Sequence, residues 1–282
     1  MEILTAVLWF LLISAVLGIA LAVASKFFKV EEDGRIGKIC ELLPGANCGG
    51  CGRAGCAAMA EAIVKGEEKP SKCAVASPEA ISQISEIMGI SVENAVKMRA
   101  QVMCSGTYDL AAKKYIYDGV RDCISAVSLA GGDKLCPNGC IGLGSCVSVC
   151  KFDAIKIING TAAVDYTKCQ ACGACVNQCP KSLIKLIPME AKYWVGCNCS
   201  EKGALTKSWC EAGCIGCKIC EKNCPTGAIK VENNLAKIDY TLCNSCGTCA
   251  EKCPRHIIWH SGENLLTPKE TANDKETETA NT

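Results

Sequence analysis

The sequence predicts an α+β protein in which small cysteine-rich units follow one apolar helix. Three observations support this prediction. The first is a run without any charged residue from Ile3 to Ala24. The second is the presence of 26 cysteines in 282 residues, most of them in closely spaced groups. The third is a pair of segments, residues 154–165 and 228–239, in each of which two short apolar stretches flank a turn and so indicate a β-hairpin.

The N-terminal run is long enough to cross a lipid bilayer. Its 22 uncharged residues would form a helix about 33 Å long. A cleaved signal peptide is the alternative, but such peptides need basic residues before the apolar core, and here none precedes Lys26. Lys26 and Lys29 follow the run, so the positive-inside rule places the rest of the chain in the cytoplasm and the N-terminus outside. Residues 1–27 are therefore predicted to be a single-pass transmembrane helix of the cell membrane.

The composition limits the roles that the cysteines can have. A cysteine-rich chain is either a disulfide scaffold or a metal protein, and disulfide scaffolds are usually short and secreted. The tight spacing of these cysteines suits metal clusters better than pairing, and thiolate ligands fit a reducing compartment. The 30 basic and 29 acidic residues nearly balance, so the chain has no excess of positive charge for binding nucleic acid, and no nucleic acid is expected as a partner.

The first cysteine group lies in residues 28–95, which are predicted to form a small four-cysteine domain. Its spacing is C-x2-C-x4-C-x16-C, with the members Cys48, Cys51, Cys56 and Cys73. Residues 57–65 are predicted to form the helix that separates the third ligand from the fourth, and 78–88 and 92–99 two further helices. A structural zinc site is the alternative for this group, although the spacing is not that of a usual zinc ribbon.

Three further runs share the pattern C-x2-C-x2-C-x3-C-P, which is typical of bacterial ferredoxins that bind [4Fe–4S] clusters. In two-cluster ferredoxins the fourth cysteine of one run ligates the other cluster. The runs are Cys169, Cys172, Cys175, Cys179; Cys214, Cys217, Cys220, Cys224; and Cys243, Cys246, Cys249, Cys253. Together they predict two ferredoxin-like two-cluster modules, residues 133–190 and 191–260, joined to the four-cysteine domain by a connecting region, 96–132.

Exchange of the fourth cysteines predicts the ligand sets. In the second module they are Cys214, Cys217, Cys220 with Cys253, and Cys243, Cys246, Cys249 with Cys224. In the first module they are Cys169, Cys172, Cys175 with Cys150, and Cys136, Cys140, Cys146 with Cys179. The last set belongs to an irregular run, C-x3-C-x5-C-x3-C, which ends in Lys151 where the other runs have proline.

Six cysteines lie outside these sets: Cys40, Cys104, Cys123, Cys197, Cys199 and Cys210. An additional small cluster and simple packing of free thiols remain open for them. Residues 96–132 are predicted to contain short strands at 100–104 and 114–117. The polar tail, 261–282, is predicted to be disordered.

The sequence contains no flavin or nicotinamide motif and no nucleophile–base pair, so no catalytic residue is predicted. Several [4Fe–4S] clusters in one chain indicate electron transfer, since each cluster carries one electron at a time.

The order of these parts resembles a known family. One membrane helix, the segment LPGANCGGCGRAGC at residues 43–56 and ferredoxin modules are similar to the B subunit of the Rnf complex, an ion-translocating ferredoxin:NAD⁺ oxidoreductase of bacterial membranes. With two modules the chain resembles the longer form of this protein. The resemblance implies five [4Fe–4S] clusters held by the 20 cysteines of the five sets, soluble ferredoxin as the electron donor, and the other membrane and peripheral Rnf subunits as partners. It implies a role in a redox-driven Na⁺ or H⁺ pump that ends on NAD⁺.

Two alternatives remain at this stage. The chain could be the polyferredoxin subunit of another membrane oxidoreductase, of the hydrogenase or formate dehydrogenase type. It could also be a membrane-tethered adaptor whose cysteines bind zinc for structural reasons.

Overall fold

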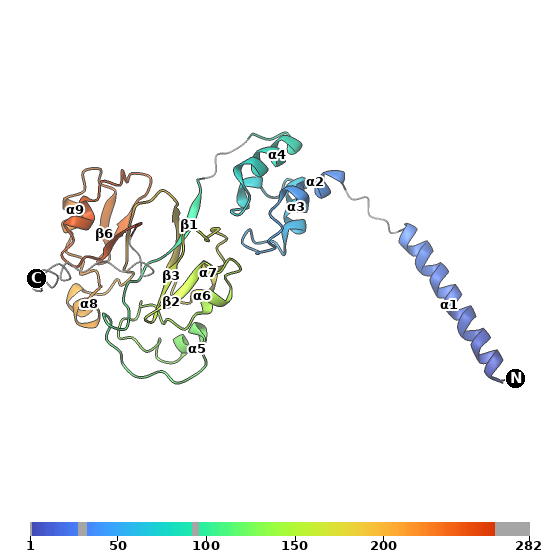
Figure 1. Cartoon of the computed structure of the whole chain (residues 1–282), viewed down its shortest axis with the longest axis horizontal. Coiled ribbons are helices and arrows are strands. Elements are labelled where there is room, and N and C mark those ends of the chain that lie inside the picture. The colour runs from blue at the N-terminus through green and yellow to red at the C-terminus, as the bar shows by residue number, and fades with distance from the viewer. Residues whose placement is uncertain (1, 28–32, 92–95, 263–282) are drawn as a thin grey trace, which may run out of the picture.

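The computed structural model describes residues 2–27, 33–91 and 96–262 (Figure 1). The helices are α1 (Glu2–Phe27), α2 (Gly34–Leu42), α3 (Cys56–Val64), the 3₁₀ helix η1 (Pro70–Lys72), α4 (Pro78–Met88), α5 (Cys123–Ser128), α6 (Ser145–Ser148), α7 (Ala174–Gln178), α8 (Gly203–Trp209), α9 (Ile219–Lys222) and α10 (Thr248–Glu251). The strands are β1 (Met98–Val102), β2 (Ile155–Ile158), β3 (Thr161–Val164), β4 (Ile184–Pro188), β5 (Tyr193–Val195), β6 (Ile229–Glu232), β7 (Leu235–Ile238) and β8 (Ile258–His260). This mixture of short helices and strands agrees with the predicted α+β class.

The N-terminal run forms α1, a helix of 26 residues. Within the described ranges, however, no helix combines the length and the apolar character that crossing a bilayer requires. The transmembrane helix predicted for residues 1–27 is therefore not supported by the structure. The predicted disordered tail falls almost entirely on residues 263–282, which lie outside the described ranges.

Helices α2, α3 and α4 pack together around a small apolar core (Figure 1). Ser77 begins α4 by accepting a hydrogen bond on its side chain from the Ala80 amide, and Gly89 ends it in the left-handed conformation. Ile39, Met59 and Ile84 are almost fully buried between the helices. The helices predicted at 57–65 and 78–88 are thus confirmed, since α3 and α4 occupy these positions.

Each ferredoxin-like region contains one hairpin of neighbouring strands. β2 pairs with β3 and β6 pairs with β7, both antiparallel, with Asn159–Gly160 and Asn233–Asn234 at the turns. These turn residues have positive φ, which asparagine and glycine adopt most easily. Both hairpins predicted from the sequence are confirmed.

Each region also has a second sheet made of strands far apart in the chain. β1 pairs with β4, and β5 pairs with β8, again antiparallel. β1 comes from the segment predicted to connect the domains, so this segment completes the sheet of the first module. The helix predicted at 92–99 is wrong at its end, because Met98 and Arg99 lie in β1; residues 92–95 lie outside the described ranges. The strand predicted at 114–117 does not form.

The two modules repeat one plan, and they contact each other just after the ends of β1 and β5. The amide after β1, that of Met103, donates to the Leu183 carbonyl, and the amide after β5, that of Gly196, donates to the Ile257 carbonyl. The Ser105 amide then donates to the Gly196 carbonyl at 2.8 Å and joins the two modules. The fully buried Arg99 also bridges them, since its guanidinium lies 3.8 Å from the ring centroid of Tyr166 and 5.5 Å from that of Trp194.

Candidate metal centres

All 26 cysteines are free thiols in the structure. In the described part of the chain, no group of three or more His, Cys, Asp or Glu residues has a geometry that could hold a single metal ion. A single Zn²⁺ draws its thiolates to about 2.3 Å, whereas a cubane cluster of eight core atoms needs a cavity between its ligands. Cavities lined by several cysteines are therefore the relevant feature, and the four described below lie within the described ranges.

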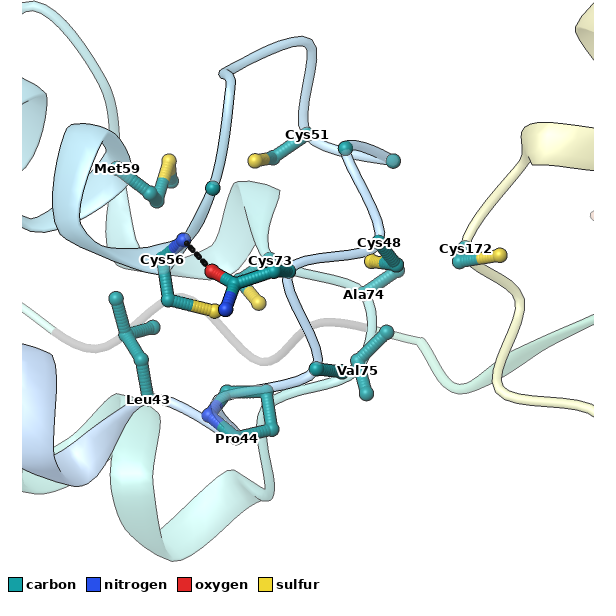
Figure 2. Close-up of a pocket in the computed structure, with 15 residues that line it drawn as sticks. Leu43, Pro44, Cys48, Cys51, Cys56, Met59, Cys73, Ala74, Val75 and Cys172 are labelled. Carbon is teal, nitrogen blue, oxygen red and sulfur yellow. Dashed lines mark hydrogen bonds between the residues drawn. The ribbon is translucent and has the colours of Figure 1, made fainter. Parts of the chain in front are cut away.

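The first cavity, of about 390 Å³, lies in the four-cysteine domain (Figure 2). It is lined by Cys48, Cys51, Cys56 and Cys73. Asn47 shapes the loop between them, because its side-chain oxygen accepts a hydrogen bond from the Cys56 amide at 2.8 Å. The structure thus brings the four cysteines of the first predicted set around one cavity.

This domain contacts the first ferredoxin-like module directly at the same cavity. Cys172 of the module lies at its edge in Figure 2. A Cβ added at Gly50 would lie 1.9 Å from the Cys172 carbonyl oxygen, so only glycine allows this approach. Lys151 donates from its ammonium to the Asn47 carbonyl at 2.6 Å. The lysine that replaces proline after Cys150 therefore links the module to the four-cysteine loop.

The predicted set that contains Cys172 is also together in space. Burial first, and then the negative charges of Cys169, Cys172 and Cys150, raise the pKa of Cys175 to about 12. Backbone amides donate to two of these sulfurs, since Ala100 N–H lies 3.4 Å from Cys169 Sγ and Ala154 N–H lies 3.4 Å from Cys150 Sγ. Amide hydrogen bonds to sulfur stabilise the thiolates that a cluster requires and help to tune its potential.

The second module brings both of its predicted sets together. A cavity of about 340 Å³ is lined by Cys214, Cys217, Cys220 and Cys253. The other set consists of Cys243, Cys246, Cys249 and Cys224. Its members lie close enough for their charges to affect one another. Burial first, and then the charges of the other three thiolates, raise the pKa of Cys249 to about 11.

The first set of the first module differs from its prediction. A cavity of about 370 Å³ is lined by Cys140, Cys146 and Cys179 together with Cys123, whereas Cys136 does not line it. Cys123 begins α5, and its amide donates to Ser145 Oγ at 2.7 Å, which ties this helix to α6. Sequence reasoning missed Cys123, although a signal was present. Leu143 stands where a regular run has its second cysteine, so a ligand had to come from elsewhere.

Cys136 lines a fourth cavity instead, of about 350 Å³, between the two modules. The other cysteines that line it were left outside every predicted set: Cys104, Cys197, Cys199 and Cys210. Lys134, whose side chain is buried, lies at the same cavity and donates to the carbonyls of Gly106 and Gly160, each at 2.7 Å.

The buried thiols share a chemical consequence. Burial raises the pKa of Cys146 and of Cys220 to about 12, so without metal these thiols are protonated at neutral pH. A thiolate in such a place needs a compensating positive charge, which iron supplies, and binding then releases protons. The donor set therefore fits iron–sulfur clusters.

Comparison with protein families gives matches across the cysteine-rich part of the chain. Residues 43–75 match a family described as a putative Fe-S cluster, and residues 213–258 match a 4Fe-4S dicluster domain. Residues 162–185 and 198–227 each match a 4Fe-4S binding domain. These matches fall on the cysteine sets described above.

Curated relatives extend the similarity to most of the chain. The B subunit of the Na⁺-translocating ferredoxin:NAD⁺ oxidoreductase complex of Acetobacterium woodii is 44% identical over 86% of this chain and 73% of its own length. The B subunit of the ion-translocating oxidoreductase complex of Methanosarcina acetivorans is 42% identical over 86% of this chain and 92% of its own length. The B subunit of the proton-translocating ferredoxin:NAD⁺ oxidoreductase complex of Clostridium ljungdahlii is 39% identical over 88% of both chains.

Proposed function

We propose a function for this chain on the premise that it belongs to the family of B subunits of Rnf complexes, the ion-translocating ferredoxin:NAD⁺ oxidoreductases. In this proposal the chain is the iron–sulfur electron-transfer subunit of such a complex. The observation that carries it is the grouping of cysteines around several closely connected centres, two of which meet at Gly50 and Cys172.

The chain's own residues would hold the clusters and keep water away from them. Each [4Fe–4S] cluster supplies one-electron transfer when bound. The cysteines are the ligands, and the short hairpins and helices fix their positions. Buried apolar residues exclude solvent from the sulfurs; for example, Cys146 shares a buried cluster with Ile155 and Ile184, and Cys220 shares another with Ile229 and Ile258. Solvent exclusion and hydrogen bonds to sulfur are the properties that set a cluster's potential.

The donor and the acceptor follow from the family. Soluble reduced ferredoxin would deliver the electrons, and other Rnf subunits would carry them on to NAD⁺. The relatives' names differ in the ion, Na⁺ for A. woodii and the proton for C. ljungdahlii, so the proposal names no ion.

A membrane location is part of the proposal. Its support is the uncharged run from Ile3 to Ala24 and the exposure of its apolar side chains, such as Trp9, Phe10 and Leu21. A helix that is apolar all round is typical of a buried or membrane-inserted position. With basic residues only after this run, the N-terminus would lie outside and the cysteine-rich domains on the cytoplasmic side.

The experiment that tests the function is ferredoxin-dependent NAD⁺ reduction in membranes that carry the Cys220→Ser variant. Loss of partners around a metal ligand typically costs 10- to 100-fold, so loss of a ligand should lower the rate by about tenfold or more. Cys40→Ser is the matched control, because Cys40 lines none of the four cavities and should leave the rate unchanged. A rate that survives Cys220→Ser would place this centre off the path of the electrons.

A further inference from the structure

The cavity between the two modules has the dimensions of a cluster site. Its volume of about 350 Å³ lies between the values of about 340, 370 and 390 Å³ for the three cavities that are lined by four cysteines of one centre. Five cysteines line it, and four of them belong to no predicted centre.

The internal repeat relates four of these cysteines in pairs. Cys104 follows the last residue of β1 by two positions, and Cys197 follows the last residue of β5 by two positions. Cys136 precedes Cys140 by four positions, and Cys210 precedes Cys214 by four positions. Each module therefore contributes two cysteines from equivalent places, and the cavity lies where these equivalent places meet.

Hydrogen bonds at the cavity match those at the other centres. Cys104 Sγ accepts from the Cys140 amide at 3.4 Å, and Cys197 Sγ accepts from the amides of Cys199 and Cys214 at 3.4 and 3.3 Å. Three cysteines of the first module's predicted sets accept the same kind of bond: Cys150, Cys169 and Cys179. Amides directed at sulfur favour a thiolate over a thiol.

The residues around the cavity also leave space beside the sulfurs and provide a positive charge. A Cβ added at Gly106 would lie 3.1 Å from Cys210 Sγ and 3.8 Å from Cys104 Sγ, so the glycine keeps the space beside both sulfurs open. Buried Lys134 places a positive charge at the same cavity. Four thiolates around a cluster carry net negative charge, which a buried ammonium offsets.

We propose that Cys104, Cys136, Cys197 and Cys210 hold a further [4Fe–4S] cluster between the two ferredoxin-like modules. Cys123 then takes the place of Cys136 beside Cys140, Cys146 and Cys179. The chain therefore holds six clusters.

Cys199 is the fifth cysteine of the cavity and is not a ligand. It has no equivalent in the first module, where Gly106 occupies the position two residues after Cys104. Its sulfur lies 3.5 Å from Thr206 Oγ1, so the Thr206 hydroxyl can donate to it and satisfy it without a metal.

The proposed centre is linked by hydrogen bonds to ligands of two other centres. Cys140, a ligand of the first module, donates its amide to Cys104 Sγ, and Cys214, a ligand of the second module, donates its amide to Cys197 Sγ. The proposed centre therefore lies between one centre of each module, and the first module in turn contacts the four-cysteine domain at Gly50 and Cys172.

Iron and sulfide analysis of the full-length chain, purified without oxygen, tests this proposal directly. Six clusters correspond to about 24 iron atoms per chain, against about 20 for five clusters. Zinc is measured on the same samples. A value of about 20 iron atoms, or one zinc ion in addition to them, would overturn the proposal, and this wild-type measurement does not depend on any variant folding.

Variants identify the ligands. Cys197→Ser should lower the content by about four iron atoms per chain and remove one centre from the Mössbauer spectrum. Cys199→Ser, at the same cavity, is the matched control and should retain the full content. Equal iron in Cys197→Ser and the wild type would contradict the assignment.

Cys136→Ser and Cys123→Ser should each remove one centre, and the double variant should remove two. If Cys123→Ser keeps all iron, the revised ligand set is wrong. This inference shares one assumption with the proposed function, namely that the regular cysteine sets hold clusters. Because iron content is read without ferredoxin or NAD⁺, a failure of the proposed electron-transfer partners would leave this result unaffected.

Discussion

At the scale of single residues, the contact between the four-cysteine domain and the first module depends on the absence of one side chain. Gly50 lies against the backbone of Cys172, and Lys151 reaches across to the Asn47 carbonyl. Both contacts involve loops that hold predicted cluster ligands. They therefore determine how closely two neighbouring centres approach.

Gly50→Ala should separate the two domains without removing their clusters. Its Cβ would overlap the Cys172 carbonyl, which is backbone and cannot move without displacing the loop. We expect faster proteolytic cleavage between the four-cysteine domain and the first module, and slower ferredoxin-dependent NAD⁺ reduction, with the iron content unchanged.

Gly37→Ala is the control for this change, because a Cβ at Gly37 would meet nothing within 4 Å. Alanine also favours a helix interior by roughly 1 kcal/mol over glycine. Wild-type cleavage rates in Gly50→Ala would show that the close approach is not required.

At the scale of elements, the sequence predicted what local patterns encode. The hairpins at β2–β3 and β6–β7 were predictable because an asparagine-containing turn separates two short apolar stretches. Helix α4 was predictable from Ser77, Pro78 and Gly89, which mark its two ends. In each case the information lies within about a dozen residues.

Pairings between distant segments could not be predicted in the same way. β1 pairs with β4 across more than 80 residues, and no local pattern specifies such a partner. The same limit applies to the centres. The regular cysteine runs predicted most sets, whereas Cys123 lies 17 positions before Cys140, and Cys136 was assigned by its nearness in sequence to a centre that it does not line.

Helix α1 supports a test of the membrane location. Deleting residues 1–27 should release a coloured protein from the membrane fraction, because the proposed anchor would be lost while the cysteine sets remain. Visible absorption and iron content of the soluble fraction measure this outcome. A truncated chain that still sediments with membranes would show that another surface attaches it.

At the scale of the whole molecule, the cysteines form much of the interior. The largest buried clusters of both modules contain cysteines beside small apolar residues such as Ala162 and Ala236. The strands are only three to five residues long. Units this small bury little apolar area, so metal must supply much of their folding free energy.

Removal of iron should therefore unfold both modules. Treatment with a chelator under reducing conditions should abolish protease resistance of residues 98–262, together with the β-sheet signal in circular dichroism. Reconstitution with iron and sulfide should restore both. An iron-free chain that kept its protease resistance would mean that the polypeptide packs independently of its clusters.

The pairing of equivalent cysteines at the cavity between the modules has an evolutionary consequence. Duplication of a domain ordinarily yields two copies of whatever the ancestor already contained. Here each copy lines the cavity with one pair, Cys104 with Cys136 and Cys197 with Cys210. Neither copy encloses that cavity alone, so a single unit could not form it without a second copy beside it.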